Sequence, residues 1–398
     1  MQGLLNEAQD YRDRMVEWRR NIHSCPETGF HLPKTSAMVA GVLEKLGFQV
    51  RTGFAESAVL GILETGRPGN TIAVRADMDA LGMQDEKDVP YRSVRDGVCH
   101  ACGHDVHTAL LLGLASYLSE HRDQIPGGCV KLIFQPAEEG PAPGGAKLIV
   151  DSGVLDGVDA IFGAHCQPQY PAGVMGCRYG SFFASGDFFE VKLKGTGCHA
   201  ASPHKGKDLI SIAMEMIRAI QNIGSREIPP MKTAVISVCS INAGVLSTKN
   251  VLPSELTFGG TYRAHDAQVR DYIAGRLEQI VRDLSRMNGI TCEFEDSFAF
   301  PSFANDRDIT DTIYQSAAEV LGQDKVMMRP EPEMGSEDFA WYTRKYKGAF
   351  FFFGVKNEEK GLTASLHNPR FDIDEDAMVP ALAVYINTLY HLLERQDV

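Results

Sequence analysis

Short apolar runs that alternate with helical patterns constrain the fold of this chain more than any other feature of its sequence. The runs lie at 59–63, 72–74, 130–134 and 160–164, and a helical pattern covers 109–118. Apolar runs of this length are typical of buried strands. Strands that alternate with helices predict an α/β fold, with a mostly parallel sheet and helices on both of its faces.

The pattern changes after Gly180. The order becomes strand, helix, strand, strand, helix, strand, which is the order of a ferredoxin-like α+β sandwich. Helices are expected at 209–220 and 269–287 of this region, and the α/β pattern then returns with a helix at 309–321. We therefore predict a catalytic domain in two parts and an inserted lid domain, with bounds at 1–183, 184–298 and 299–398.

Charge and composition narrow the possible partners. The 398 residues include 39 Lys and Arg and 52 Asp and Glu, a formal net charge of −13, which argues against binding to nucleic acid or to an anionic membrane. The N-terminus lacks the regions of a secretory signal, and no apolar stretch approaches the roughly 18 residues of a spanning helix. The nine scattered cysteines fit a reducing compartment. We expect a cytoplasmic protein that acts on a small molecule.

Polar residues follow several of the predicted strands. They are Asp77 and Asp79 after 72–74, Glu138 and Glu139 after 130–134, His165 after 160–164, and His367 in the loop after the strand FFFFGV. The segment CHACGHDVHT adds Cys102 and His104 at the start of a helix. Because ligands of such sheets bind at the carboxyl ends of the strands, we expect these side chains to converge on one crevice.

A thiolate, imidazoles and carboxylates together suit zinc or manganese. The number of ligands is sufficient for two ions roughly 3.5–4 Å apart, which can share a water, lower its pKa and polarise a carbonyl group. The tandem Glu138-Glu139 can divide the work, since one carboxylate can bind metal while its neighbour deprotonates the water.

Several motifs resemble those of the aminoacylase/carboxypeptidase metallopeptidase family. They are VRADMDALGMQD at 74–85, VCHACGHDVHT at 98–108, FQPAEEG at 134–140, GTGCHAASP at 195–203, SEDF at 336–339 and LHNPRFDIDED at 366–376. The resemblance covers the whole chain in order, and the pair CGHD and PAEEG is its most specific part. It is closest to the amidohydrolase branch of hippurate hydrolases, indole-acetyl-amino-acid hydrolases and N-acetyl-diaminopimelate deacetylases.

The resemblance implies a role for each residue of the crevice. It implies two divalent ions, manganese or zinc with nickel and cobalt as further candidates, bound by Cys102, His104, Glu139, His165 and His367. Cys102 would bridge the ions, Glu138 would be the general base and acid, and Asp79 would be the catalytic aspartate. Asp77 takes the place of a histidine ligand of distant relatives, which leaves its role open.

The resemblance also implies roles for lid residues. His199 would reach the active site of the partner subunit in a homodimer formed through the lid, and would stabilise the oxyanion there. Asn250 and Arg263 would hold the substrate carboxylate. An ion pair with Asp266 is the alternative for Arg263.

The sequence therefore predicts a metal-dependent amidohydrolase that cleaves N-acyl-L-amino acids to a carboxylate and an amino acid. A metallo-dipeptidase or aminopeptidase of the same family is the alternative, and a metalloprotein without catalytic activity is a third. The acyl group and the amino acid are not indicated.

Other patterns are interpreted as structural. Cys129, Cys239 and Cys292 are interpreted as core residues. The sequence GTGCHA at 195–200 imitates a dinucleotide-binding fingerprint, but Pro203 comes too soon for the helix that such a site needs.

Overall fold

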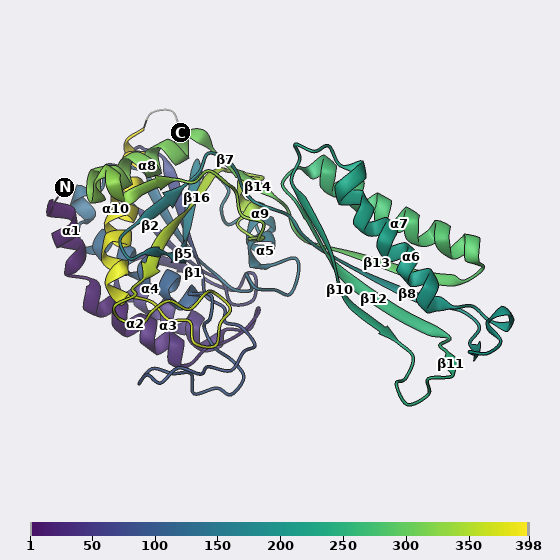
Figure 1. Ribbon diagram of the computed structural model, residues 1–398. Coiled ribbons are helices and arrows are strands. Elements are labelled where there is room, and N and C mark those ends of the chain that lie inside the picture. Colours follow the sequence, from purple (N-terminus) through teal and green to yellow (C-terminus); the bar gives the residue numbers. More distant parts are fainter. Residues whose placement is uncertain (1, 396–398) are drawn as a thin grey trace. The chain divides into compact units, whose positions relative to one another are not determined.

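The computed structural model describes residues 2–395, which form two compact units (Figure 1). The first unit contains the chain up to Phe182 together with Ala304–Glu331 and the chain from Asp338. The second contains Phe183–Phe303 and Pro332–Glu337, a short segment that the sequence analysis placed in the catalytic domain. The chain passes between the units within strands β7 (Gly180–Phe183) and β14 (Phe303–Asn305).

The first unit is a mixed α/β structure. Its strands are β1 (Gln49–Arg51), β2 (Val59–Glu64), β3 (Thr71–Asp77), β4 (Cys129–Gln135), β5 (Ala160–Pro171), β6 (Met175–Cys177), β15 (Val326–Met328) and β16 (Lys347–Lys356). Its helices are α1 (Gln2–Gln9), α2 (Arg12–Ser24), α3 (Pro33–Lys45), α4 (His104–Glu120), α5 (Gly145–Asp151), α8 (Arg307–Leu321), α9 (Ala340–Thr343) and α10 (Met378–Glu394).

The strands of this unit form one sheet in the order β1-β2-β4-β3-β5-β16-β6-β15. The four central strands, β4, β3, β5 and β16, are parallel, whereas β2 and β6 run antiparallel to their inner neighbours. This confirms the prediction of an α/β fold with a large, mostly parallel sheet. In Figure 1, α4 and α10 lie on one side of the sheet and α5 and α9 on the other.

Helix α4 runs through the middle of the first unit, packed against β3, α2 and α10. Every residue from His104 to Leu118 is buried. The apolar pattern covered only 109–118, but the motif CHACGHDVHT placed a helix start at Cys102 and His104, and the structure confirms this start. The five residues before Ala109 include His104, Asp105 and His107, which are polar and therefore hide the first turn from an analysis of apolar periodicity.

The second unit is an α+β structure. Its elements are β8 (Gly186–Lys194), β9 (Cys198–His199), α6 (Leu209–Asn222), β10 (Ala234–Ala243), β11 (Val251–Leu252), β12 (Glu255–Ala264), α7 (Ala267–Asn288) and β13 (Thr291–Phe300). The four long strands form an antiparallel sheet in the order β10-β12-β8-β13, and β9 pairs with β11. Side chains of α6 and α7 form an apolar core with residues of this sheet.

Of the three cysteines interpreted as core residues, Cys239 is exposed, and Cys129 and Cys292 are partly buried. The pairing of β10 with β12 shifts register between Val238 and Ser240, so Cys239 is the extra residue of a bulge. The interpretation rested on the usual burial of an isolated cysteine, which does not hold at this bulge. Within 2–395, no helix has both the length and the apolar character needed to span a bilayer.

Candidate metal centre

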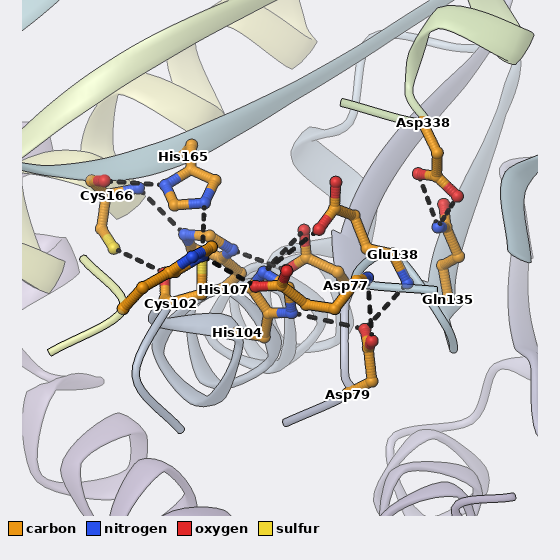
Figure 2. A network of polar contacts seen from close by, with 12 residues as sticks. Asp77, Asp79, Cys102, His104, His107, Gln135, Glu138, His165, Cys166 and Asp338 are labelled. Atoms are coloured by element: carbon orange, nitrogen blue, oxygen red, sulfur yellow. Dashed lines mark hydrogen bonds and ion pairs between the residues drawn. The ribbon is translucent and has the colours of Figure 1, made fainter. Parts of the chain in front are cut away.

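The polar residues predicted to meet in the first unit do so at one end of the parallel strands (Figure 2). Asp77 is the last residue of β3, and the Glu138-Glu139 pair follows β4. His104 is the first residue of α4, and His367 lies in the loop between β16 and α10. The ends of several elements therefore supply the cluster, as expected for a ligand site of an α/β sheet.

The sulfur of Cys102 is shared by two groups of possible metal ligands. Its Sγ lies 3.3 Å from Nε2 of His165 and 3.3 Å from Nε2 of His367. Donor atoms of Cys102, His104 and His165 all lie within 4.8 Å of one another, and so do those of Cys102, Glu139 and His367. The structure thus brings together the five residues that the resemblance implied as ligands, and two of the groups that they form share the sulfur of Cys102.

Gly103 makes this arrangement possible. Its φ of +88° is unfavourable for other residues, and a Cβ at this position would lie 2.3 Å from the sulfur of Cys166. Glycine between Cys102 and His104 therefore permits the sharp entry into α4 that presents both side chains to the same space.

His104 has the surroundings of a metal ligand. Its Nδ1 lies 3.3 Å from Asp79, and its Nε2 lies 3.8 Å from both Asp77 and Glu138. Both ring nitrogens are buried and neither has a hydrogen-bond partner. Burial lowers the pKa of His104, but the carboxylates of Asp77 and Asp79 outweigh it and raise the pKa to about 10. The site thus favours a positive charge, which a divalent ion would supply.

Asp79 fixes the tandem glutamates. Its two carboxylate oxygens accept hydrogen bonds of 3.0 Å from the backbone amides of Glu138 and Glu139. Oε1 of Glu139 lies 3.1 Å from Nε2 of His367. Burial raises the pKa of Glu139, but His367 and His104 lower it further than burial raises it. Glu139 is therefore held as a carboxylate beside the imidazole of His367.

Two residues of the site have a left-handed backbone. Ala137, just before the glutamates, has a φ of 57°, and His367 has a φ of 58°. Side chains other than glycine rarely adopt this conformation, and such residues cluster at functional sites.

The position of His165 corrects one expectation. The sequence placed it beyond a strand end, but β5 continues to Pro171 and His165 pairs with Phe352 of β16. Nδ1 of His165 lies 2.7 Å from the carbonyl oxygen of Cys166. With this carbonyl as acceptor, Nδ1 carries the hydrogen and Nε2 presents its lone pair toward Cys102.

The chemistry of Cys102 also fits a bound cation. Burial, with Glu139 and Glu138 nearby, raises the pKa of its thiol well above the ordinary value. A thiolate at this position therefore needs a compensating positive charge, and metal binding displaces the proton of a coordinating thiol. Sulfur, imidazole and carboxylate are the donors that zinc accepts.

The three candidate residues of the second unit lie in two places. His199 is exposed in β9, with Nδ1 accepting the amide hydrogen of Ala201 at 3.1 Å, and the carbonyl of Asn250 accepts the amide hydrogen of Ala200 at 2.9 Å. Arg263 is half-buried in β12 and donates to Oγ of Ser336 at 2.9 Å.

The alternative of an ion pair between Arg263 and Asp266 is not what the structure contains. The Asp266 carboxylate accepts the amide hydrogens of Gln268 and Val269 at the start of α7, and it pairs with Lys232. Asp266 is thus the N-cap of a helix, a role for which aspartate is well suited.

Sequence reasoning left several polar residues around the cluster without a role. They are Arg75, His107, Cys166 and Asp338, all of them buried. His107 follows His104 by three positions, and residues with this spacing lie on the same face of a helix. That spacing was the available signal for His107, whereas Arg75 and Asp338 meet only because their strand and loop are neighbours in space.

The fold and the cluster together define a class: an α/β protein with a thiol, imidazoles and carboxylates gathered at the carboxyl ends of its parallel strands. The sequence profile described as peptidase family M20/M25/M40 matches residues 73–391. The chain belongs to this family, and it is a hydrolase that acts on amide bonds.

Particular relatives agree with this assignment. IAA-amino acid hydrolase ILR1-like 4 of Arabidopsis thaliana is 38% identical over 94% of this chain and 84% of its own length. Thermostable carboxypeptidase 2 of Saccharolobus solfataricus is 37% identical over 95% of both chains. The crystal structure of YXEP of Bacillus subtilis, a dinuclear metal binding peptidase of the M20 family, has a TM-score of 0.82 and 31% identity, with 97% of this chain and 99% of that chain covered.

Proposed function

We propose that this protein is a metal-dependent amidohydrolase that cleaves the amide bond of N-acyl-L-amino acids. The observation that carries the proposal is the sulfur of Cys102, which two sets of donor atoms share beside the buried carboxylate of Glu138. The relative named as an IAA-amino acid hydrolase supports the choice of an N-acyl amino acid as substrate.

Two divalent ions would be held by this chain's own residues. Cys102, His104 and His165 would hold one, Cys102, Glu139 and His367 the other, and manganese or zinc suits these donors, with nickel and cobalt as further candidates. When bound, such a pair lowers the pKa of a water molecule and polarises a carbonyl group.

Glu138 is the candidate for the proton transfers. Its side chain is only 7% exposed, and Oε2 lies 3.8 Å from the imidazole of His104. A carboxylate at this position can take a proton from the attacking water and give it to the leaving nitrogen, while Asp79 holds the backbone of the turn.

The roles of the second unit come from the resemblance of the sequence. We propose that this unit is a lid and mediates formation of a homodimer, and that His199 stabilises the oxyanion in the site of the partner copy. Arg263 and Asn250 would bind the substrate carboxylate. A guanidinium group is suited to this because it donates two parallel hydrogen bonds.

The test compares two neighbouring substitutions. Glu138→Gln should leave both ions bound and reduce turnover by about 10²–10⁴-fold, the usual contribution of a general acid or base. Glu139→Gln, the matched control, should lose bound metal, as elemental analysis will show. Near-normal turnover in Glu138→Gln would exclude this residue as the base.

A peptidase is the second candidate, because the relative from Saccharolobus is named a carboxypeptidase. An aminopeptidase or dipeptidase needs a site for the free amine of its substrate. Comparing N-acetyl-Xaa with Xaa-Xaa substrates of the same Xaa separates the two functions. We expect faster cleavage of the acetylated series, and faster cleavage of the dipeptides would favour the peptidase.

A further inference from the structure

The residues directly behind His165 form a chain of buried hydrogen bonds in which Asp77 and His107 stand at the centre (Figure 2). We propose that Asp77 and His107 are a positioning pair, which fixes the backbone of Cys166 and thereby aims Nε2 of His165 at the cation that Cys102 would also bind. The inference rests on the proposed metal centre, and it assigns a role to two residues that do not touch the substrate.

The first step is the tautomer of His107. The backbone amide of Cys166 donates to Nε2 of His107 at 2.9 Å, so this nitrogen carries no hydrogen. The hydrogen therefore resides on Nδ1, which lies 2.6 Å from Oδ1 of Asp77. Both ring nitrogens are thus in use, so His107 has no lone pair left for a cation although it lies among the ligands.

Asp77 is itself held in place. Its Oδ2 accepts a hydrogen bond of 2.6 Å from Nη1 of Arg75, and its backbone carbonyl accepts one of 2.8 Å from Thr108 of α4. Arg75 also donates a hydrogen bond of 2.8 Å to the carboxylate of Asp338. Asp77, Arg75 and Asp338 are at most 1% exposed, so the orientation of Asp77 is determined by packing and bonds on every side.

The backbone of Cys166 connects His107 to His165. Its amide is bound by His107, and the carbonyl of the same residue accepts the hydrogen of Nδ1 of His165 at 2.7 Å. The imidazoles of His107 and His165 also pack edge to face, with centroids 4.6 Å apart. Nε2 of His165 is left facing Sγ of Cys102 at 3.3 Å. Partners of this kind fix the ring orientation of a metal-binding histidine.

A purely structural role explains these residues less well. Burying an aspartate, an arginine and a histidine costs free energy that apolar residues of similar volume would avoid. The chain of bonds also ends on a candidate ligand, because it continues through the backbone of Cys166 to Nδ1 of His165.

The experiment measures cation affinity instead of activity. The purified protein is stripped with a chelator and titrated with Co²⁺, by calorimetry and by the thiolate-to-cobalt absorption that reports Cys102. His107→Phe keeps an aromatic ring against His165 but removes both hydrogen bonds. We expect about 10–100-fold weaker binding of one Co²⁺, the usual effect of losing a partner of a metal ligand, with the thiolate absorption retained through the other ion.

Two further variants separate positioning from folding. His107→Gln has an amide oxygen that can accept the hydrogen of Cys166, and it should recover most of the affinity. Leu118→Ala, a buried residue at the far end of the same helix, should lower thermal stability without changing the affinity for Co²⁺. If His107→Phe fails to fold, Asp77→Asn supplies the test, with an expected loss of about tenfold.

The outcomes discriminate clearly. Unchanged affinity in His107→Phe or in Asp77→Asn would overturn the positioning role, and so would an equal loss in His107→Phe and His107→Gln. Failure of the unaltered protein to show thiolate-to-cobalt absorption would instead contradict the proposed metal centre.

Discussion

The candidate functional residues of the first unit are mostly buried, with His367 as an exposed exception, whereas those of the second unit are exposed or half-buried. In the first unit Asp77, Asp79 and His104 are at most 1% exposed, and each lies close to charged or polar neighbours. In the second unit His199 and Asn250 are exposed, and Arg263 is half-buried with a bond to Ser336. Bonds within the chain therefore fix the buried residues of the first unit, whereas the side chains of His199 and Asn250 lie at the surface, where the proposed partner contact and substrate contact can be tested.

The largest expected effect tests how strongly the first unit depends on buried charge. Arg19, in α2, is 1% exposed and binds Asp105 at 2.9 Å and Asp372 at 2.5 Å. Arg19→Met leaves these carboxylates without their partner, so the free energy of unfolding should fall by about 3–5 kcal/mol. Arg12→Met, a partly exposed arginine of the same helix, should lower the free energy of unfolding by less than about 1 kcal/mol. If urea denaturation gives equal losses of unfolding free energy for the two variants, the first unit does not depend on the buried charge of Arg19.

The stability lost in Arg19→Met should depend on pH. Burial raises the pKa of Asp372, but Arg19 and Tyr91 outweigh it, and the net pKa lies below its ordinary value. A carboxylate whose pKa is lower in the folded state stabilises the fold above its unfolded pKa of about 3.9, and this stabilisation is lost as the pH falls through the lower value. The difference between the natural protein and Arg19→Met should therefore be largest near neutral pH and shrink below about pH 4.

The second prediction tests whether a partner copy completes the site. His199→Ala should reduce kcat by about 10²–10³-fold, the effect of losing one oxyanion donor. His204→Ala, a nearby exposed histidine, should leave kcat unchanged. A heterodimer of Glu138→Gln and His199→Ala chains, isolated with two affinity tags, should regain about half the turnover, since one of its two sites is whole. A heterodimer as inactive as its parents would place His199 in its own chain's site or outside catalysis.

The third prediction concerns Arg263 alone. Arg263→Ala should raise KM for N-acyl amino acids by about tenfold to a hundredfold, because a hydrogen bond to a charged group contributes about 1.5–3 kcal/mol. Hydrolysis of the corresponding N-acyl amino acid amides, which lack the carboxylate, should change little. An equal rise in KM for both substrate series would show that Arg263 does not bind the substrate carboxylate.

The smallest expected effect concerns the exposed strand of the second unit. Cys239→Ser should change the free energy of unfolding by less than about 0.5 kcal/mol, because the side chain lies on the surface at a bulge. Cys177→Ser, a fully buried cysteine of the first unit, is the matched comparison and should cost more. A large loss of stability in Cys239→Ser would mean that this surface is covered in solution.

Much of the site could be predicted because its residues lie in short sequence motifs. Cys102, His104 and the glutamate pair stand in short motifs beside strand ends, and the geometry of parallel sheets brings such ends together. The start of α4 could be placed from the CGHD motif, although its first turn is polar and lies outside the apolar pattern. His165 was misplaced because the pairing of β5 with β16, which extends the strand beyond it, involves residues nearly 200 positions away.

The supporting residues were harder to predict. Asp77 and His107 are 30 positions apart, and Arg75 and Asp338 are separated by 263. The sequence around each residue does not indicate which residue it contacts, because the contact depends on how α4, β3 and β5 pack. The interpretation of Cys239 as a core residue failed because it used only the usual burial of cysteine, and the sequence did not indicate the bulge that lies there.

The claim on which the account depends is that one sulfur serves two cations, and diffraction at the absorption edge of the bound metal measures this directly. Crystals of the protein loaded with manganese or zinc should give two anomalous peaks, one on each side of Sγ of Cys102 and about 3.5–4 Å apart. The account would be contradicted if no peak lay near this sulfur, or if a single ion bound without it.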